Sequence, residues 1–236
     1  GGIGTATAIR FIEEGARVVI FDIDENAIQK IEKKLPSLVK CIRADVTSQS
    51  SLDLAFNKLI DAVGGLDILI NNAGISYRHH FIDISVQEWE KLIQINLTGV
   101  FFVAQRAARL MLSSGGGVII NMGSTNGLVG YHYYSDYNAS KAGVIELTRS
   151  MALELGPAIR VNAVCPGFIM TPMQEAEYTE EMQRAFYEKL PMKRLGLPED
   201  VAALFAFLSS DDASWITGQH FVIDGGELAG GLASQA

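Results

Sequence analysis

Residues 124–141 read Ser-Thr-Asn-Gly-Leu-Val-Gly-Tyr-His-Tyr-Tyr-Ser-Asp-Tyr-Asn-Ala-Ser-Lys, and the rest of the sequence is best interpreted from this stretch. Its centre is the pair Tyr137 and Lys141. If the segment is helical, four residues turn the chain by about 400° and advance it roughly 6 Å, so both side chains share one face. An ammonium close to a phenol favours the phenolate and lowers a pKa that is ordinarily near ~10. The pair therefore predicts a general base that can take the proton of an alcohol near neutral pH.

The spacing of this pair is weak evidence alone, and its neighbours strengthen it. Ser124 follows the apolar run at residues 118–122, which is typical of a buried strand. Asn71-Asn72-Ala73-Gly74 follows a second such run at residues 66–70. In an open parallel sheet ligands bind at the carboxyl ends of the strands, so these polar residues indicate a site.

The start of the chain has the pattern of a dinucleotide-binding fold. Gly1-Gly2-Ile3-Gly4 opens a helical stretch, and a predicted buried strand at residues 17–21 ends in Asp22. The glycines would let backbone N–H groups approach a pyrophosphate. Asp22 would accept hydrogen bonds from the adenosine ribose and repel a 2′-phosphate, which favours NAD over NADP. Alternatively, Asp22 caps the helix that begins near Glu25.

Two other polar residues each have two alternative roles. Asp45 could meet the adenine amino group or cap the helix that begins near Ser48. Asn96 lies inside the helical pattern of residues 85–113, where an amide is costly unless it is used. It could fix a water beside Lys141, or it could bond back to its own helix.

Composition excludes several classes of protein. The chain has 236 residues, 48% hydrophobic and 19% charged, which suffices for a large core. A net charge of −8 argues against binding to nucleic acid. No apolar run reaches the length of a transmembrane helix, and the His, Cys and Asp residues lack metal-ligand spacing, so we expect neither a membrane partner nor a metal. Two distant cysteines indicate reduced thiols in a cytoplasmic protein.

The alternation of strands and helices predicts the fold class. It is an α/β protein with one Rossmann-type doubly wound parallel sheet between two helical layers, a single domain over residues 1–236. Residues 172–195 are predicted to form a helical excursion or substrate lid. Because the sequence starts inside a phosphate loop, we expect that a first strand precedes Gly1. The sequence does not decide whether a targeting peptide precedes that strand.

Taken together, these motifs resemble the classical short-chain dehydrogenase/reductase family over essentially the whole chain. Gly2-Ile3-Gly4 is similar to the end of the family's Thr-Gly-x-x-x-Gly-x-Gly motif, and Asn162-Ala-Val-Cys-Pro166-Gly167 matches a later block. The resemblance implies a catalytic tetrad of Asn96, Ser124, Tyr137 and Lys141. It implies cofactor contacts by Gly2, Ile3, Gly4, Asp22, Ile23, Asp45, Val46, Asn72, Ala73, Gly74, Tyr137, Lys141, Pro166, Gly167, Ile169 and Thr171.

The implied activity is reversible hydride transfer between NAD(H) and a secondary alcohol or ketone, with a polyol, sugar or other small alcohol favoured as substrate. Substrate contacts are expected from Ser76, His80, Tyr131, His132 and Met173. Resemblance also implies a homotetramer, assembled through the helices at 98–113 and 138–155.

Three other functions share some of these sequence features. A 3-oxoacyl-[acyl-carrier-protein] reductase shares the motifs, but that branch typically uses NADPH. Asp22 has no Arg or Lys beside it, and Gly1 rather than a basic residue precedes Gly2, which argues against this branch. An acidic chain is also a poor partner for an acidic carrier protein. A dinucleotide-sensing binding protein or a methyltransferase would leave Tyr137 and Lys141 without a role.

Overall fold

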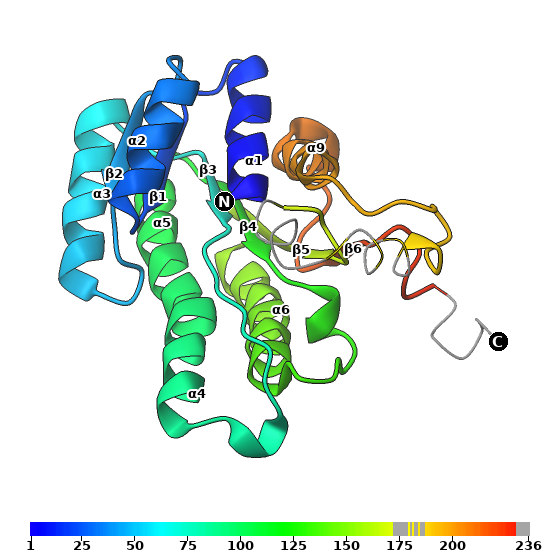
Figure 1. Ribbon diagram of the computed structural model, residues 1–236. Coiled ribbons are helices and arrows are strands. Elements are labelled where there is room, and N and C mark those ends of the chain that lie inside the picture. Colours follow the sequence, from blue (N-terminus) through cyan, green and yellow to red (C-terminus); the bar gives the residue numbers. More distant parts are fainter. Residues whose placement is uncertain (172–178, 180, 182–183, 185–186, 230–236) are drawn as a thin grey trace.

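The computed structural model describes residues 1–171, 179, 181, 184 and 187–229. Within these residues all paired strands are parallel (Figure 1). One ladder joins β1 (Val19–Asp22) to β2 (Lys40–Arg43). The other runs in the order β3 (Ile68–Asn71), β4 (Gly117–Met122), β5 (Ile159–Pro166) and β6 (His220–Ile223). The predicted α/β class with a parallel sheet is confirmed.

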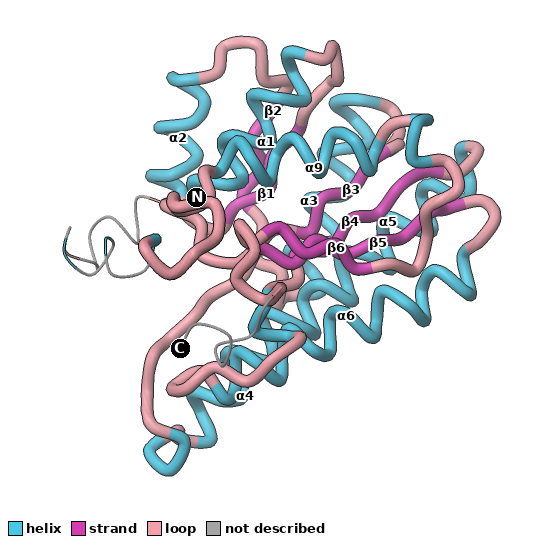
Figure 2. The backbone as a smooth tube through the Cα atoms, turned by 90° about the vertical axis from the view of Figure 1, so that its right-hand side faces the viewer, coloured by secondary structure: helices cyan, strands magenta, loops and turns pink. Residues whose placement is uncertain are grey.

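Helices cover both faces of the strands, giving the three layers that Figures 1 and 2 show. On one face α1 (Gly2–Glu13) packs against α9 (Pro198–Ser209). The other face carries α3 (Gln49–Val63), α5 (Val100–Ser114) and α6 (Ser135–Leu155). The remaining helices are α2 (Glu25–Lys34), beside β1 and β2, and α4 (Val86–Ile93), which leads towards α5.

Strand β4 separates the two halves of the core. Its side chains alternate between the faces because successive residues of a strand point in opposite directions. Ile119 packs with α3, α5 and α6, whereas Val118 and Ile120 pack with α1 and α9. Ile119 and Ile120 are fully buried, so the sheet is covered on both sides, as an apolar run without polar alternation predicts.

Local sequence signals set the helix ends. The Asp24 side chain accepts from the Asn26 N–H at the start of α2, and Ser85 with Glu88 forms a capping box at the start of α4. Helix α3 ends at Gly64, whose φ of 81° suits glycine. Pro198 begins α9. No helix of the described chain is both long and apolar enough to cross a bilayer.

The predicted helical segment over residues 85–113 is confirmed, but its pitch changes in the middle. A π-helical turn, Gln94–Gly99, separates α4 from α5 and contains Asn96. Gly99 allows Val46 to pack against this turn, since a Cβ at Gly99 would lie 2.8 Å from the Val46 Cγ2. Half of the proposed lid at 172–195 lies outside the described residues.

Candidate active site

The polar residues that follow the strands meet at one edge of the sheet. Because the described strands of each ladder are parallel, Asn71, Ser124 and Pro166 lie at or just after the carboxyl ends of one ladder, and Asp22 ends β1 in the other. A Cβ at Gly4, in the first turn of α1, would lie 3.1 Å from the Asn72 Nδ2. The glycine-rich start therefore lies directly against the end of β3.

Helix α6 presents Tyr137 and Lys141 on the same face, as the spacing predicted. The Lys141 Nζ lies 5.6 Å from the centroid of the Tyr137 ring and donates to the Met122 carbonyl oxygen at 2.8 Å. This bond ties the helix to the end of β4. The Ser124 side chain in turn interacts with the Tyr137 phenol and favours its ionised form. The Ser124 hydroxyl also pairs with Asn126, which orients it at the strand end.

The electrostatics of this pair differ from the expectation. Burial raises the pKa of Tyr137, and the Ser124 hydrogen bond lowers it only in part. Burial also lowers the pKa of Lys141 to about 8. The expected net lowering of the phenol pKa is not found here, because loss of water raises this pKa by more than the interaction with Ser124 lowers it. Tyr137 is therefore a neutral hydrogen-bond donor at pH 7.

The Asn96 side chain bonds to residues outside its own helix. Its Oδ1 accepts from the Ile75 N–H and its Nδ2 donates to the Ile75 carbonyl oxygen, both at 2.8 Å. The Nδ2 also lies 3.3 Å from the Ser140 Oγ. The amide thus clamps the loop after β3 to α6, and the expectation that it bonds its own helix is wrong. The π-helical turn places this amide towards the loop.

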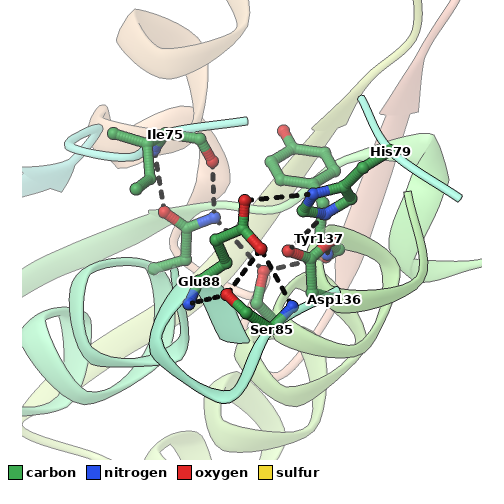
Figure 3. A network of polar contacts seen from close by, with 8 residues as sticks. Ile75, His79, Ser85, Glu88, Asp136 and Tyr137 are labelled. Atoms are coloured by element: carbon green, nitrogen blue, oxygen red, sulfur yellow. Dashed lines mark hydrogen bonds and ion pairs between the residues drawn. The ribbon is translucent and has the colours of Figure 1, made fainter. Parts of the chain in front are cut away.

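Sequence reasoning missed a polar network beside Tyr137 (Figure 3). Asp136 is fully buried, and its Oδ1 accepts from the Tyr137 N–H at 2.8 Å. Its Oδ2 lies 3.0 Å from the His79 Nε2, and the His79 Nδ1 lies 4.0 Å from a Glu88 carboxylate oxygen. The network joins the loop after β3, the start of α4 and the first turn of α6. An acid immediately before the tyrosine was the available sequence signal.

The residues fit a dinucleotide cofactor at two points. A Cβ at Gly74 would lie 3.3 Å from the Asn96 Oδ1 and 3.7 Å from the Lys141 Nζ, so glycine keeps this backbone close to the tetrad. The buried Lys141 ammonium has three donors, and one bonds to Met122. The remaining donors suit the hydroxyls of a ribose.

The two candidate acids for the adenosine portion do not cap helices. Asp22 accepts from the Asp24 N–H, while Asp24 itself caps α2. Asp45 accepts from the backbone and hydroxyl of Thr47, while Ser48 caps α3. The capping alternatives for Asp22 and Asp45 are therefore wrong.

A basic side chain lies near Asp22 in space. Arg43 is its partner in the β1–β2 register, and the Arg43 Nε donates to the Ile23 carbonyl oxygen at 3.3 Å. Ile23 is exposed next to Asp22. The sequence showed no basic neighbour because Arg43 comes from the adjacent strand.

The other predicted cofactor residues follow the strand ends. Pro166 ends β5 and Gly167 follows it, and buried Ile169 forms an isolated bridge with Gly196. Thr171 closes the described segment. Ala73 is exposed after β3.

The substrate candidates divide into three groups. Ser76, His80 and His132 are exposed, and both His80 and His132 contact the ring of Tyr133. Tyr131 is half-buried and donates to the Glu227 carboxylate, a residue that sequence reasoning did not identify. Met173 lies outside the described residues.

The structure contains no group of three or more potential metal ligands in the part of the chain it describes. Cys41 and Cys165 are free and buried. Burial raises the pKa of each thiol to about 11, so neither is a ready nucleophile.

Comparison with known proteins gives consistent matches over nearly the whole chain. A family model described as enoyl-(acyl carrier protein) reductase matches residues 1–227. The chain is 39% identical over 229 residues to the 3-oxoacyl-[acyl-carrier-protein] reductase FabG of Thermotoga maritima, covering 95% of this chain and 93% of that protein. It is 35% identical over 226 residues to the NAD-dependent glycerol dehydrogenase of Listeria innocua, covering 95% and 89%. The solved structure of gox2181 superposes with a TM-score of 0.90 at 36% identity, covering 95% of this chain and 91% of that one.

Proposed function

We propose a function from one premise: the chain belongs to the short-chain dehydrogenase/reductase family. It is an oxidoreductase that acts on alcohol and ketone substrates. Our proposal is more specific: the enzyme transfers a hydride between NAD(H) and a small secondary alcohol or ketone, with polyols and sugars favoured. The observation that carries it is the buried contact of Ser124, Tyr137 and Lys141 at the carboxyl end of β4.

Each residue of this group has a distinct role in the proposal. The bound nicotinamide would supply the hydride acceptor or donor. Tyr137 exchanges the proton of the substrate hydroxyl, acting as the acid when a ketone is reduced. Ser124 donates to the substrate oxygen and steadies the charge that develops there. Lys141 holds ribose hydroxyls, and Asn96 fixes the loop at Ile75 so that the backbone beside Gly74 keeps its position.

The raised pKa of the phenol bears on the direction of catalysis. A neutral Tyr137 is ready to protonate a ketone oxygen, whereas oxidation of an alcohol first requires the phenolate. A cation close to the phenol favours that phenolate. We therefore expect oxidation to become faster as the pH rises and reduction to become slower.

The choice of NAD rests on Asp22. A carboxylate at the end of β1 accepts hydrogen bonds from ribose hydroxyls and repels a 2′-phosphate. The relative from Listeria innocua carries NAD dependence in its name. Arg43 favours NADP instead, because a guanidinium on the adjacent strand is suited to binding a 2′-phosphate.

That guanidinium, together with the FabG relative, supports 3-oxoacyl-[acyl-carrier-protein] reductase as the second candidate. This enzyme would use NADPH and a long acidic partner protein. The net charge of −8 disfavours such a partner. We rank it second for that reason.

The test is an initial-rate survey of the full-length protein. Polyols, sugars, simple secondary alcohols and 3-hydroxyacyl thioesters are each offered with NAD and with NADP. We expect NAD-dependent oxidation of small alcohols, and we expect Tyr137→Phe to retain NADH binding while losing at least 100-fold in kcat. Turnover of the variant within tenfold of the parent would refute the role of Tyr137.

The cofactor assignment is tested by a matched pair of variants. Asp22→Ser should improve kcat/KM with NADP at least tenfold, because it removes the repulsion of the 2′-phosphate. Arg43→Ala should leave NAD kinetics within twofold of the parent. Higher kcat/KM of the parent with NADP, lost in Arg43→Ala, would instead establish the second candidate's cofactor.

We propose two further properties of this enzyme. A homotetramer through α5 and α6 is supported by exposed apolar side chains on those helices, Phe101, Leu112 and Leu153. The cytoplasm is the proposed location, in keeping with two free, buried thiols. Sedimentation of the full-length protein at micromolar concentration tests the first property.

A further inference from the structure

The loop after β6 brings a carboxylate to the substrate side of the site. The Tyr131 hydroxyl donates to the Glu227 Oε1 at 2.7 Å, although the two residues are 96 positions apart. Tyr131 belongs to the segment between β4 and α6, and its backbone oxygen accepts from the Asn138 side chain at 3.0 Å. Asn138 immediately follows Tyr137. The contact therefore links the end of the chain to the first turn of the catalytic helix.

A second contact places Tyr131 beside Ser124. The side chain of Thr125, the residue that follows Ser124, interacts with the Tyr131 hydroxyl and lowers its pKa in part, against the larger effect of burial. Tyr131 thus connects Glu227 to Thr125, which follows Ser124, and to Asn138, which follows Tyr137.

Glu227 differs from an ordinary surface acid. It is half-buried, and loss of water is the largest influence that raises its pKa. Its neighbour Asp224 uses both oxygens within the loop, accepting from the Gly226 and Leu228 N–H groups at 2.8 Å. The loop is thereby fixed by one acid while it presents the other.

The two oxygens of Glu227 differ in their partners among the residues that the structure describes. Oε1 accepts from Tyr131, whereas Oε2 forms no hydrogen bond within this part of the chain. A Cβ at Gly167 would lie 2.7 Å from that Oε2. Because Gly167 follows the last residue of β5, the free oxygen lies over the carboxyl end of this strand, where ligands bind in parallel sheets. Glycine at position 167 keeps that approach open.

We propose that Glu227 is a specificity-determining residue that accepts a hydrogen bond from a second hydroxyl of the substrate. The enzyme would then select vicinal diols and larger polyols over alcohols with one hydroxyl. This inference rests on the proposed function. A charged acceptor makes a strong hydrogen bond to a hydroxyl, and a substrate without that hydroxyl leaves the partly desolvated oxygen unpaired.

The experiment compares two substrates that differ by one hydroxyl, propane-1,2-diol and propan-2-ol, in NAD-dependent oxidation by the full-length protein. We expect the parent enzyme to have a kcat/KM at least tenfold higher for the diol, as hydrogen-bond selection of a hydroxyl allows. Glu227→Gln keeps one oxygen that can accept from Tyr131. It replaces the other oxygen with an NH2 group, which cannot accept a hydrogen bond from the substrate. The kcat/KM of this variant for propane-1,2-diol should fall towards its value for propan-2-ol. Its kcat/KM for propan-2-ol should equal that of the parent.

Two further variants separate recognition from a structural role. Tyr131→Phe breaks the contact with the loop but retains the carboxylate, so it should lower kcat/KM for both substrates by the same factor. Glu13 is an exposed acid on α1, and Glu13→Gln is the matched control that should change neither kcat/KM value. If Glu227→Gln leaves the ratio of the two kcat/KM values unchanged, for example by lowering both equally, this inference is overturned while the proposed function stands. If the parent oxidises no alcohol of the survey, the proposed function fails and this inference falls with it.

Discussion

Replacing Lys141 with Met should stabilise the protein at neutral pH while removing its activity. Lys141 is 2% exposed, and burial lowers its pKa from 10.5 to about 8. At pH 7 the ammonium is charged both in the folded state, where it lacks water, and in the unfolded state, where it is solvated. Met has a similar length and no charge to bury, so the variant avoids this cost.

The magnitude follows from the pKa difference. Lowering the pKa of Lys141 from 10.5 to about 8 corresponds to about 3 kcal/mol of unfolding free energy at pH 7. Between about pH 8 and 10.5 the unfolded state binds more protons than the folded state. The stability of the parent therefore rises with pH through this window, relative to the variant. Loss of the hydrogen bond to Met122 offsets about 1 kcal/mol of the gain at all pH values.

The assay is urea unfolding of both proteins at intervals from pH 7 to pH 10. The variant should be more stable by about 2 kcal/mol at pH 7, and the difference should shrink by about 2 kcal/mol as the pH reaches 10. Cys165→Ser in both backgrounds prevents titration of the neighbouring thiol. Lys30→Met, at an exposed site on α2, should show no such trend. A difference between Lys141→Met and parent that stays constant with pH would refute the reasoning.

Two other predictions concern contacts around the site. His79→Ala leaves the buried Asp136 carboxylate without its imidazole partner and should cost about 2–3 kcal/mol in urea unfolding. Adding Asp136→Asn should restore part of that loss, and equal stability of the single and double variants would contradict the pairing. Gly115 and Gly116 have nearly the same positive φ, 108° and 109°, but only at Gly116 would a Cβ overlap a backbone oxygen. In thermal unfolding, Gly116→Ala should therefore cost at least about 2 kcal/mol more than Gly115→Ala, and matching melting temperatures would show that the loop relaxes.

Patterns that depend on neighbours in sequence predicted much of the fold. The strands ending at Asp22 and Met122 are short apolar runs. The second is buried on both faces, which leaves it no polar alternation, whereas the first is only partly buried. Cap residues such as Gly64 fixed helix ends because each satisfies backbone groups a few positions away. The shared face of Tyr137 and Lys141 follows from helical geometry alone.

What sequence could not supply depends on contacts between distant segments. Arg43 lies beside Asp22 only through strand register, and Asn96 finds Ile75 only through the π-helical turn. The pKa of Tyr137 was misjudged because proximity to an ammonium is visible in a motif, whereas loss of water is not. Glu227 was missed because its partner is 96 residues away.

The π-helical turn at Gln94–Gly99 makes the site sensitive to the length of the chain at one point. A π turn accommodates an extra residue within a helix, and each residue of an α-helix rotates the following side chains by about 100°. Deleting one residue here would let the helix close into regular α geometry and turn the Asn96 amide away from the loop it clamps. The hydrophobic face of the helix would survive that deletion. Among homologous sequences, alignment gaps should therefore be rarer in these six residues than in the loops on either side.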